Sequence, residues 1–236
     1  MMNLLEKIDR RFSHSSSRLT DFIFPAHTTR KNKQSNEKAL RYTEIAQPAI
    51  GGISLAMVRI LERFGLKPDA TCGHSFGELT ALCAAGWMDE DTFIDLSIAR
   101  GQTMAKGSGT DDRGAMVAVK APIEELAEFC KSRSGLTLAN LNSPEQGVLS
   151  GPSDQIEQAQ KELKEKGFHC FRLPVSAAFH SKLLKKAALT FQATIDKSCF
   201  TPSSIPVYSN STGRPYPVDS NGVKTTLGSQ MLSPVQ

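Results

Sequence analysis

The segment GHSFG at residues 73–77 places a serine between two glycines, after a short apolar stretch and before an alanine- and leucine-rich one. We predict a strand over residues 69–72 and a buried helix over residues 78–85, so that the pentapeptide forms the sharp turn between them. Such a turn exposes the serine hydroxyl and directs the next backbone amide, that of Phe76, at a developing oxyanion. The pattern therefore predicts that Ser75 is a nucleophile.

A nucleophilic serine needs a base, and the sequence offers two histidines for this role. His180 lies in VSAAFHS, residues 175–181, after a predicted strand and among small side chains. His169 lies beside a cysteine at the end of a polar helix, where we expect it to be exposed. We therefore favour His180. No acidic residue stands out as the third member of a triad, so a backbone carbonyl is the alternative partner of the imidazole.

A predicted helix over residues 90–104 carries an arginine on its apolar face. Arg100 lies four residues after Leu96 and seven after Phe93, so the three share one side of the helix. Two interpretations of Arg100 stay open. In the first, its aliphatic chain covers apolar surface while its guanidinium reaches solvent. In the second, the guanidinium is fixed to bind a substrate carboxylate through two hydrogen bonds. Gln47, at the start of an earlier helix, either joins the same pocket or faces solvent.

Composition and charge exclude several classes of protein. The 236 residues are 39% hydrophobic and 22% charged, which is typical of a globular protein with one sizeable core. The net charge of +4 comes from residues 1–41, which hold nine basic and four acidic side chains. The sequence lacks a basic stripe with interleaved aromatic residues, and no apolar run approaches the roughly 20 residues of a membrane span. We therefore predict neither nucleic acid nor a membrane as a partner.

Five cysteines are scattered along the chain without a Cys-x-x-Cys pair, namely Cys72, Cys83, Cys130, Cys170 and Cys199. This odd, unpaired set argues against a disulfide framework and against a zinc site, and the five histidines show no ligand spacing. We therefore predict no metal site, reduced thiols and a cytoplasmic protein without a targeting signal.

The pattern of apolar residues divides the chain into three parts. Residues 1–42 are predicted to be irregular apart from a short helix near the start, with a solvated loop at 28–38. Residues 114–173 follow the strand-helix-strand-strand-helix-strand (β-α-β-β-α-β) order of a ferredoxin-like subdomain. Residues 43–113 and 174–236 form the surrounding α/β core, a hydrolase-like domain with a parallel sheet, into which this small lobe is inserted.

Five segments taken together resemble one protein family. They are AQPAIGGISLAM (46–57), GHSFGELTALCAAGW (73–87), ARGQTM (99–104), NLNSPEQGVLSG (140–151) and VSAAFHS (175–181). From about residue 43 to its end, the chain resembles the acyltransferase domains of the malonyl-CoA:acyl-carrier-protein transacylase family, in particular those within polyketide and polyunsaturated fatty acid synthases. The resemblance implies an acyltransferase of fatty acid or polyketide biosynthesis.

The resemblance also implies a role for each residue that matches the family's motifs. Ser75 would be the acylated nucleophile and His180 its base, while Arg100 would pair with the free carboxylate of a malonyl group. Gln47 and Phe76 would belong to the substrate pocket.

Three further positions take implied roles beside these. Asn142 and the backbone near Gln230 would orient the catalytic histidine. The sequence form around Phe179 is similar to the one associated with malonyl selectivity, so this side chain would contact the substrate.

The implied reaction has two halves and uses no bound cofactor. A malonyl-serine ester forms from the CoA thioester, and the phosphopantetheine thiol of an acyl carrier protein or carrier domain then accepts the acyl group. Other domains or subunits of a synthase are the further partners that the resemblance implies.

The sequence also departs from the family pattern. The family opens with a strand and a Gly-Gln-Gly loop whose glutamine amide completes the oxyanion hole, and no such loop occurs here; FIFP at residues 22–25 is only superficially similar to that strand. We therefore expect a chain truncated at both ends relative to the family. An impaired or inactive acyltransferase fragment, or a docking module, stays an alternative. A serine esterase is the other alternative, although it needs an acidic triad member and the inserted lobe argues against it.

Overall fold

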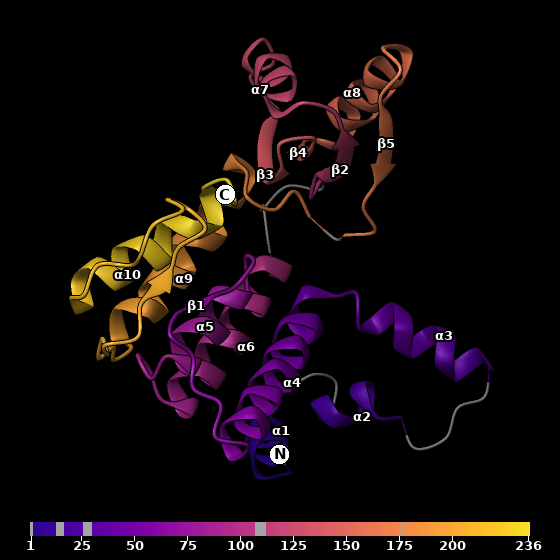
Figure 1. Ribbon diagram of the computed structural model, residues 1–236. Coiled ribbons are helices and arrows are strands. Elements are labelled where there is room, and N and C mark those ends of the chain that lie inside the picture. Colours follow the sequence, from indigo (N-terminus) through magenta and orange to yellow (C-terminus); the bar gives the residue numbers. More distant parts are fainter. Residues whose placement is uncertain (1, 13–16, 26–29, 107–111, 176) are drawn as a thin grey trace.

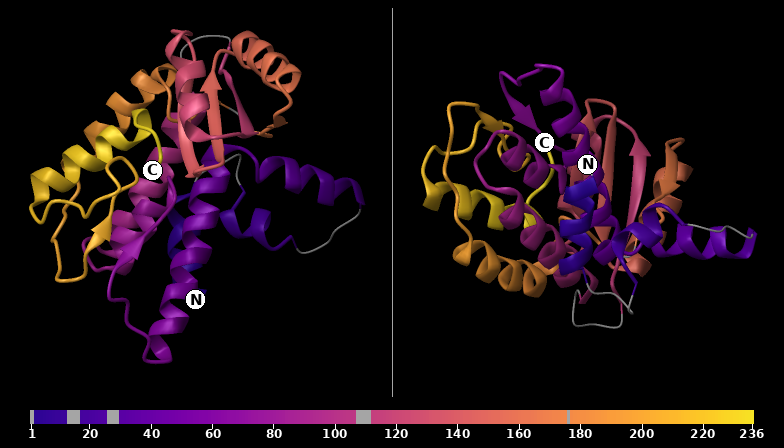
Figure 2. Two further views of the ribbon diagram at one scale, coloured as in Figure 1. Left: turned by 45° about the horizontal axis from the view of Figure 1, so that its top comes forward. Right: turned by 90° about the horizontal axis from the view of Figure 1, so that it is seen from below.

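Figure 1 shows a computed structural model of the chain, which describes residues 2–12, 17–25, 30–106, 112–175 and 177–236. The chain forms a larger, mostly helical body and a smaller lobe that contains a four-stranded sheet (Figures 1 and 2). The smaller lobe comes from the middle of the sequence, so the chain leaves the body and later returns to it.

The body is built mainly of helices. Its helices are α1 (Met2–Arg11), α2 (Leu19–Ile23), α3 (Arg30–Ala39), α4 (Thr43–Arg63), α5 (Gly77–Ala84), α6 (Glu90–Lys106), α9 (Lys185–Lys197) and α10 (Ser220–Ser229). A 3-10 turn, η1 (Lys182–Leu184), precedes α9, and a second, η2 (Gln230–Leu232), follows α10. Two short strands, β1 (Thr71–Cys72) and β6 (Val207–Tyr208), pair in parallel.

Small residues set the spacing of α4, α5 and α6 around the main apolar core. A β-carbon on Gly51 of α4 would lie 2.8 Å from the ring of Phe76, which precedes α5. One on Gly101 of α6 would lie 2.7 Å from the carbonyl oxygen of Thr43 in α4. A larger residue at Gly101 would therefore meet the backbone of α4, whereas one at Gly51 would have to displace an aromatic ring.

One helix of the described residues, α4, is long and apolar enough to cross a membrane by length and composition alone. Core helices of soluble proteins pass the same test, and 44% of its most apolar window is buried within the protein. The helix packs against α1, α2, α5 and α6. We therefore interpret α4 as a core helix along the face that packs against these helices, while Ile50, Met57 and Leu61 are exposed on the remainder of its surface.

The smaller lobe confirms the predicted order of strands and helices. Its elements are β2 (Ala115–Lys120), α7 (Ile123–Lys131), β3 (Thr137–Ser143), β4 (Gln146–Gly151), α8 (Ser153–Glu165) and β5 (His169–Arg172). The sheet is antiparallel with the strand order β3-β4-β2-β5, as in a ferredoxin-like fold. Alternate residues of β2 face opposite sides: Val117 and Val119 share a core with α7 and α8, whereas Met116 and Ala118 share one with Phe179.

The last residues of the chain join the lobe to the body. The Val235 amide donates to the carbonyl of Ala139 at 2.9 Å, and the Leu141 amide donates to the carbonyl of Val235 at 2.8 Å. The end of the chain therefore lies along β3 (Figure 1). The Gln236 amide donates to the carbonyl of Asn210 in the body at 2.9 Å, so this segment has partners on both sides.

The prediction of a loop at residues 28–38 is wrong over residues 30–38, which lie in α3. Helices are predicted from the periodicity of apolar residues, and the segment RKNKQSNEKA is not predicted as a helix because it has no apolar stripe. Its Lys, Arg, Gln, Glu and Ala residues are good helix formers, which accounts for the difference. Residues 22–25, which are only superficially similar to the family's first strand, contain the end of α2 at Ile23.

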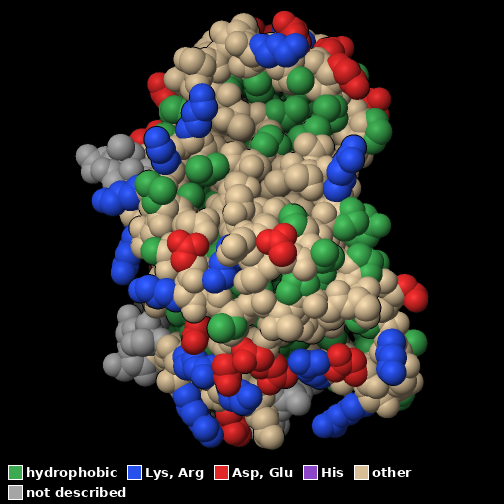
Figure 3. Space-filling model, turned by 90° about the vertical axis from the view of Figure 1, so that its left-hand side faces the viewer, with side chains coloured by type: hydrophobic (Ala, Val, Ile, Leu, Met, Phe, Trp, Pro, Cys, Tyr) green, Lys and Arg blue, Asp and Glu red, His purple; other side chains and the backbone are tan. Residues whose placement is uncertain are grey.

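The first helix of the basic N-terminal segment, α1, packs onto the body instead of lying free in solvent. In α1, Leu4, Leu5 and Ile8 are buried in the main core. Lys7 lies 3.5 Å from Glu90, and Arg11 lies 2.8 Å from Asp91, both in the first turn of α6. Acidic and basic side chains are also interspersed over the face shown in Figure 3.

Gly101→Ala is expected to destabilise the protein by about 1–3 kcal/mol, because the added methyl group would meet the backbone of α4. Gly77→Ala is the matched control, since nothing lies within 4 Å of its added β-carbon. Its free energy of unfolding should stay unchanged or rise. Urea unfolding of the purified variants measures both, and equal stability of the two would contradict the close approach of α4 and α6.

Candidate active site

The chain passes from the strand β1 through the segment GHSFG into the helix α5, as predicted. The segment GHSFG forms the sharp turn between the two elements. Ser75 occupies the left-handed region with φ 51°, a conformation that costs a non-glycine residue about 1–3 kcal/mol. A β-carbon on Gly73 would lie 2.1 Å from the backbone of Gly77, so only glycine fits there. The turn thus holds the serine in a strained conformation at the start of α5.

The turn brings Ser75 against His180, which also has a positive φ of 56°. Ser75 Oγ lies 2.8 Å from His180 Nε2. On the other side of the ring, His180 Nδ1 lies 3.1 Å from the carbonyl oxygens of both Gln230 and Ser233. Two acceptors at Nδ1 assign the proton to that nitrogen, which leaves Nε2 free to accept the proton of Ser75. Backbone carbonyls thus stand where a triad would have a carboxylate.

The surroundings of His180 favour its neutral form. The side chain is buried, and this burial, followed by the positive charge of Arg100, lowers the pKa of His180 to about 4. The two carbonyls that accept from Nδ1 act in the opposite direction, and their effect is smaller. A neutral imidazole at physiological pH is the form that can act as a base.

The guanidinium of Arg100 is buried beside the same serine. Its side chain is 2% exposed, so the alternative in which the head reaches solvent is wrong. Nη1 donates to Gln47 Oε1 at 2.9 Å, and Nη2 donates to Gln230 Oε1 at 3.0 Å and to Ser75 Oγ at 3.4 Å. Burial lowers the pKa of Arg100 to about 10, against a raising effect of Glu78. All three hydrogen-bond partners are neutral, and no carboxylate forms an ion pair with this side chain within the described ranges.

The remaining predicted residues lie at different distances from this centre. Gln47 is buried in α4, and its Nε2 lies 3.1 Å from Met104 Sδ. Phe76 is buried, with its ring centroid 6.0 Å from the guanidinium carbon of Arg100. Phe179 is half-buried and packs where the main core meets the second face of the small sheet.

Asn142 does not orient His180 in this structure. Its side chain is exposed at the end of β3, and the hydrogen bonds of His180 Nδ1 go to Gln230 and Ser233 instead. The buried asparagine of this strand is Asn140, whose Nδ2 lies 3.3 Å from His74 Nε2. Residues 140 and 142 of a regular strand would share one face, but the pairing of β3 with β4 shifts its register between Leu141 and Ser143, so a motif match alone did not distinguish the two asparagines.

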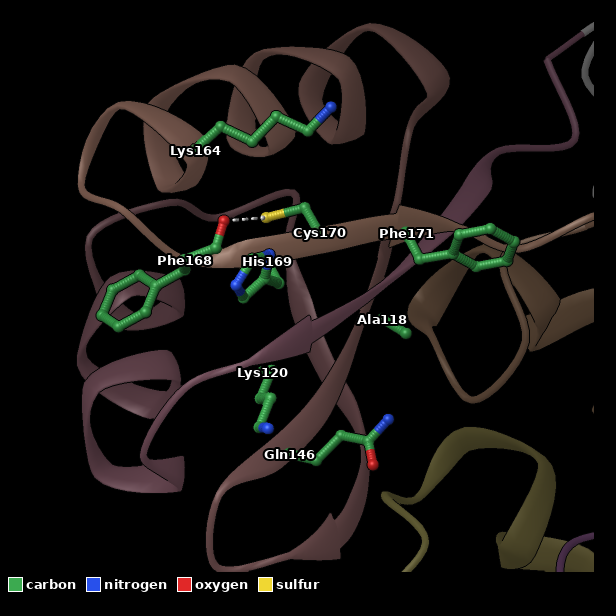
Figure 4. A pocket seen from close by; sticks show the side chains of 8 residues that line it. All are labelled: Ala118, Lys120, Gln146, Lys164, Phe168, His169, Cys170 and Phe171. Atoms are coloured by element: carbon green, nitrogen blue, oxygen red, sulfur yellow. Dashed lines mark hydrogen bonds between the residues drawn. The ribbon is translucent and has the colours of Figure 1, made fainter.

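A hollow of about 540 Å³ on the small lobe is separate from this centre (Figure 4). It is lined by residues of β2, β4, β5 and α8, among them Lys120, Lys164 and the rival base His169. His169 pairs with Lys120 across the strands β2 and β5 and is exposed. The structure therefore does not bring it near Ser75. Within the described ranges, no cluster of three metal-ligating side chains occurs.

Two features of the site were not identified from the sequence. The Ser233 carbonyl on the imidazole carries no side-chain signal and depends only on the path of the chain after η2. The amide of Ser75 donates to Asn210 Oδ1 at 2.5 Å, and Asn210 lies in a polar loop after β6 that resembles an ordinary turn. The amide of Phe76, in contrast, has no acceptor in the described part of the chain, so it is free to bind an oxyanion as predicted.

The fold agrees with comparisons to known proteins. A model of the acyl transferase domain matches residues 6–227, so the chain belongs to this family. The chain is 37% identical over 205 residues to the polyketide biosynthesis protein PksE of Bacillus subtilis, which covers 84% of the chain and 26% of that relative.

Two other relatives are matched over more of their own length. The polyketide biosynthesis malonyl CoA-acyl carrier protein transacylase BaeC of Bacillus velezensis is 34% identical over 235 residues, which is 97% of the chain and 75% of BaeC. The structure of an acyl-carrier-protein-S-malonyltransferase from Bartonella henselae matches with a TM-score of 0.87 and 29% identity, over 100% of the chain and 73% of that protein. The chain thus spans about a quarter of PksE and about three quarters of the other two.

The depressed pKa of His180 gives a pH prediction. The rate at which a fluorophosphonate labels Ser75 should stay constant from pH 8 down to about 5 and fall with a midpoint near pH 4, because only protonation of His180 removes the base. Mass spectrometry of the labelled peptide measures the rate, circular dichroism at each pH controls for unfolding, and full reactivity on return to pH 7 controls for irreversible loss. A midpoint at the ordinary histidine value near 6.5 would contradict the effect of burial.

Proposed function

We propose that this protein transfers a malonyl group from CoA to the phosphopantetheine thiol of an acyl carrier protein, through an ester on Ser75. The observation that carries the proposal is the buried guanidinium of Arg100, which lies 3.4 Å from the nucleophilic oxygen and has only neutral partners. A malonyl group on Ser75 has a free carboxylate at its far end. This carboxylate would satisfy the cation, whereas an acetyl group would not.

In the first half-reaction, Ser75 Oγ attacks the thioester carbonyl carbon while its proton moves to His180 Nε2. The oxyanion that forms accepts a hydrogen bond from the Phe76 amide, and the positive end of α5 adds to this stabilisation. The C–S bond then breaks, the imidazolium returns its proton to the leaving sulfur, and CoA departs. The carbonyls of Gln230 and Ser233 stabilise the imidazolium while it exists.

In the second half-reaction, the carrier's thiol gives its proton to His180, and its sulfur attacks the malonyl-serine ester. The C–O bond to Ser75 breaks, the serine oxygen recovers the proton, and a malonyl thioester leaves on the carrier. The relative BaeC is named a malonyl CoA-acyl carrier protein transacylase, which supports this choice of donor and acceptor. PksE and BaeC are both named for polyketide biosynthesis, which supports polyketide or fatty acid synthesis as the setting.

We further propose that the protein needs no metal, and that Phe179 and Gln47 line the acyl pocket. A cytoplasmic location is the corresponding proposal, and the five free thiols are compatible with it. The carrier could be a separate protein or a domain of a synthase, and both supply the same thiol.

Ser75→Ala is expected to abolish acylation, because no other group in the site can form the ester. Intact-mass analysis after incubation with malonyl-CoA should show one malonyl group on the unaltered protein and none on the variant. Release of free malonate without preference for a carrier would point to an esterase. The absence of an adduct on the unaltered protein would point to an inactive domain.

Arg100→Ala is expected to change the choice of acyl group. Loading from malonyl-CoA should fall by roughly ten- to a hundredfold, the cost of about one to two charge-assisted hydrogen bonds, and acetyl loading should rise relative to it. Arg10→Ala is the matched control, since the Arg10 side chain is 78% exposed on α1. Competition between the two thioesters measures the ratio, and an unchanged ratio would exclude the carboxylate role of Arg100.

A further inference from the structure

A fully buried carboxylate lies behind the nucleophile and takes no part in the chemistry described above. Glu78 is 0% exposed in the first turn of α5, three residues after Ser75. Both of its oxygens have partners: Oε1 accepts from the Asn210 amide, and Oε2 accepts from the hydroxyl of Tyr216. A buried carboxylate is costly unless it is hydrogen-bonded in this way, so its presence at this position needs a reason.

The two partners of Glu78 lie near the two ends of one loop. The chain turns back between Ser209 and Arg214, where the Ser209 amide donates to the Arg214 carbonyl at 2.9 Å, and the Tyr216 amide donates to the Val207 carbonyl at 2.7 Å. One side chain of α5 therefore fixes this loop against the helix that begins at the nucleophile.

Every polar group of the Asn210 backbone is bound in this arrangement, and its side chain reaches the nucleophile. Its amide donates to Glu78, and its carbonyl accepts from Gln236 at 2.9 Å. With the backbone held at both groups, Asn210 Oδ1 accepts from the Ser75 amide at 2.5 Å. The other backbone group of Ser75 is also bound, because Gln230 Nε2 donates to the Ser75 carbonyl at 2.5 Å.

We propose that Asn210, anchored by Glu78, is a positioning residue that holds Ser75 in the left-handed conformation in which Oγ reaches both His180 and Arg100. Without the bond to Asn210, the Ser75 peptide could relax towards the ordinary right-handed region and carry the hydroxyl away from the imidazole. The bond also occupies the Ser75 amide, so that the Phe76 amide is the one left for the oxyanion. The inference deepens the proposed function and rests on it for the identity of the acyl donor.

The test compares two measurements on Asn210→Ala. The rate constant for acylation by malonyl-CoA should fall by about ten- to a hundredfold, because a shift of the nucleophile of about 1 Å has an effect of this size. The dissociation constant of malonyl-CoA, measured on Ser75→Ala with and without Asn210→Ala, should stay within about twofold, since Arg100 and Gln47 are untouched. If Asn210 acted only in folding, its removal would not lower the rate constant for acylation while leaving the dissociation constant of malonyl-CoA unchanged.

Labelling of Ser75 by a fluorophosphonate gives a second readout that needs no acyl donor. Asn210→Ala should lower this rate as it lowers acylation, and Asn210→Asp, which keeps the acceptor oxygen, should restore most of it. Ser211→Ala is the matched control in the same loop, because the Ser211 hydroxyl has no hydrogen-bond partner among the described residues. Should Asn210→Ala not fold, Asn210→Ser takes its place, since its shorter side chain is polar but cannot reach the Ser75 amide.

The outcomes separate this inference from the proposed function. If the unaltered protein reacts with the fluorophosphonate but not with malonyl-CoA, the proposed acyl donor is wrong. The labelling rates of the Asn210 variants then decide the positioning role by themselves. Labelling of Asn210→Ala or Asn210→Ser at the unaltered rate would overturn the positioning role. Failure of Asn210→Asp to label faster than Asn210→Ala would overturn it too, because the acceptor oxygen would then be irrelevant.

Discussion

The burial of one positive charge is the constraint on which the rest of the site depends. Removing a guanidinium from water costs several kcal/mol unless its donors are satisfied, and Arg100 is 2% exposed. Its donors reach Gln47 in α4, Gln230 in η2 and Ser75 in the turn before α5. These segments are far apart in the sequence, so satisfying a single side chain fixes three separate parts of the body around Ser75.

The same charge acts on the base. Together with burial it keeps the pKa of His180 low, so the imidazole is neutral, and the carbonyls at Nδ1 hold its proton on the side away from Ser75. A carboxylate in place of those carbonyls would raise the pKa of His180 and would also compete with an anionic substrate for the guanidinium. Neutral backbone partners are therefore compatible with the proposed binding of a negatively charged acyl group.

The sequence predicted the parts of the fold that have strong local signals. The turn around Ser75 was predicted from its glycine spacing and from the change from strand to helix, which are local signals. The ferredoxin-like lobe was predicted from the order in which its strand and helix segments follow one another along the chain. The helix α3 was missed because its side chains are polar all round. The contacts of Ser233 and Asn210 with His180 and Ser75 were missed for another reason: they depend on how distant loops return to the site, and neither residue belongs to a recognisable pattern.

The path of the last residues links the two lobes mechanically to the base. The Ser233 carbonyl accepts from His180 Nδ1, and two residues later Val235 is hydrogen-bonded to the edge of β3 in the small lobe. A rotation of the small lobe that widened the space between the lobes would pull on this tail and so on the atom that orients the imidazole. The orientation of the His180 imidazole and the separation of the lobes are in this way linked through residues 233–235, so a movement that parted the lobes would change both together.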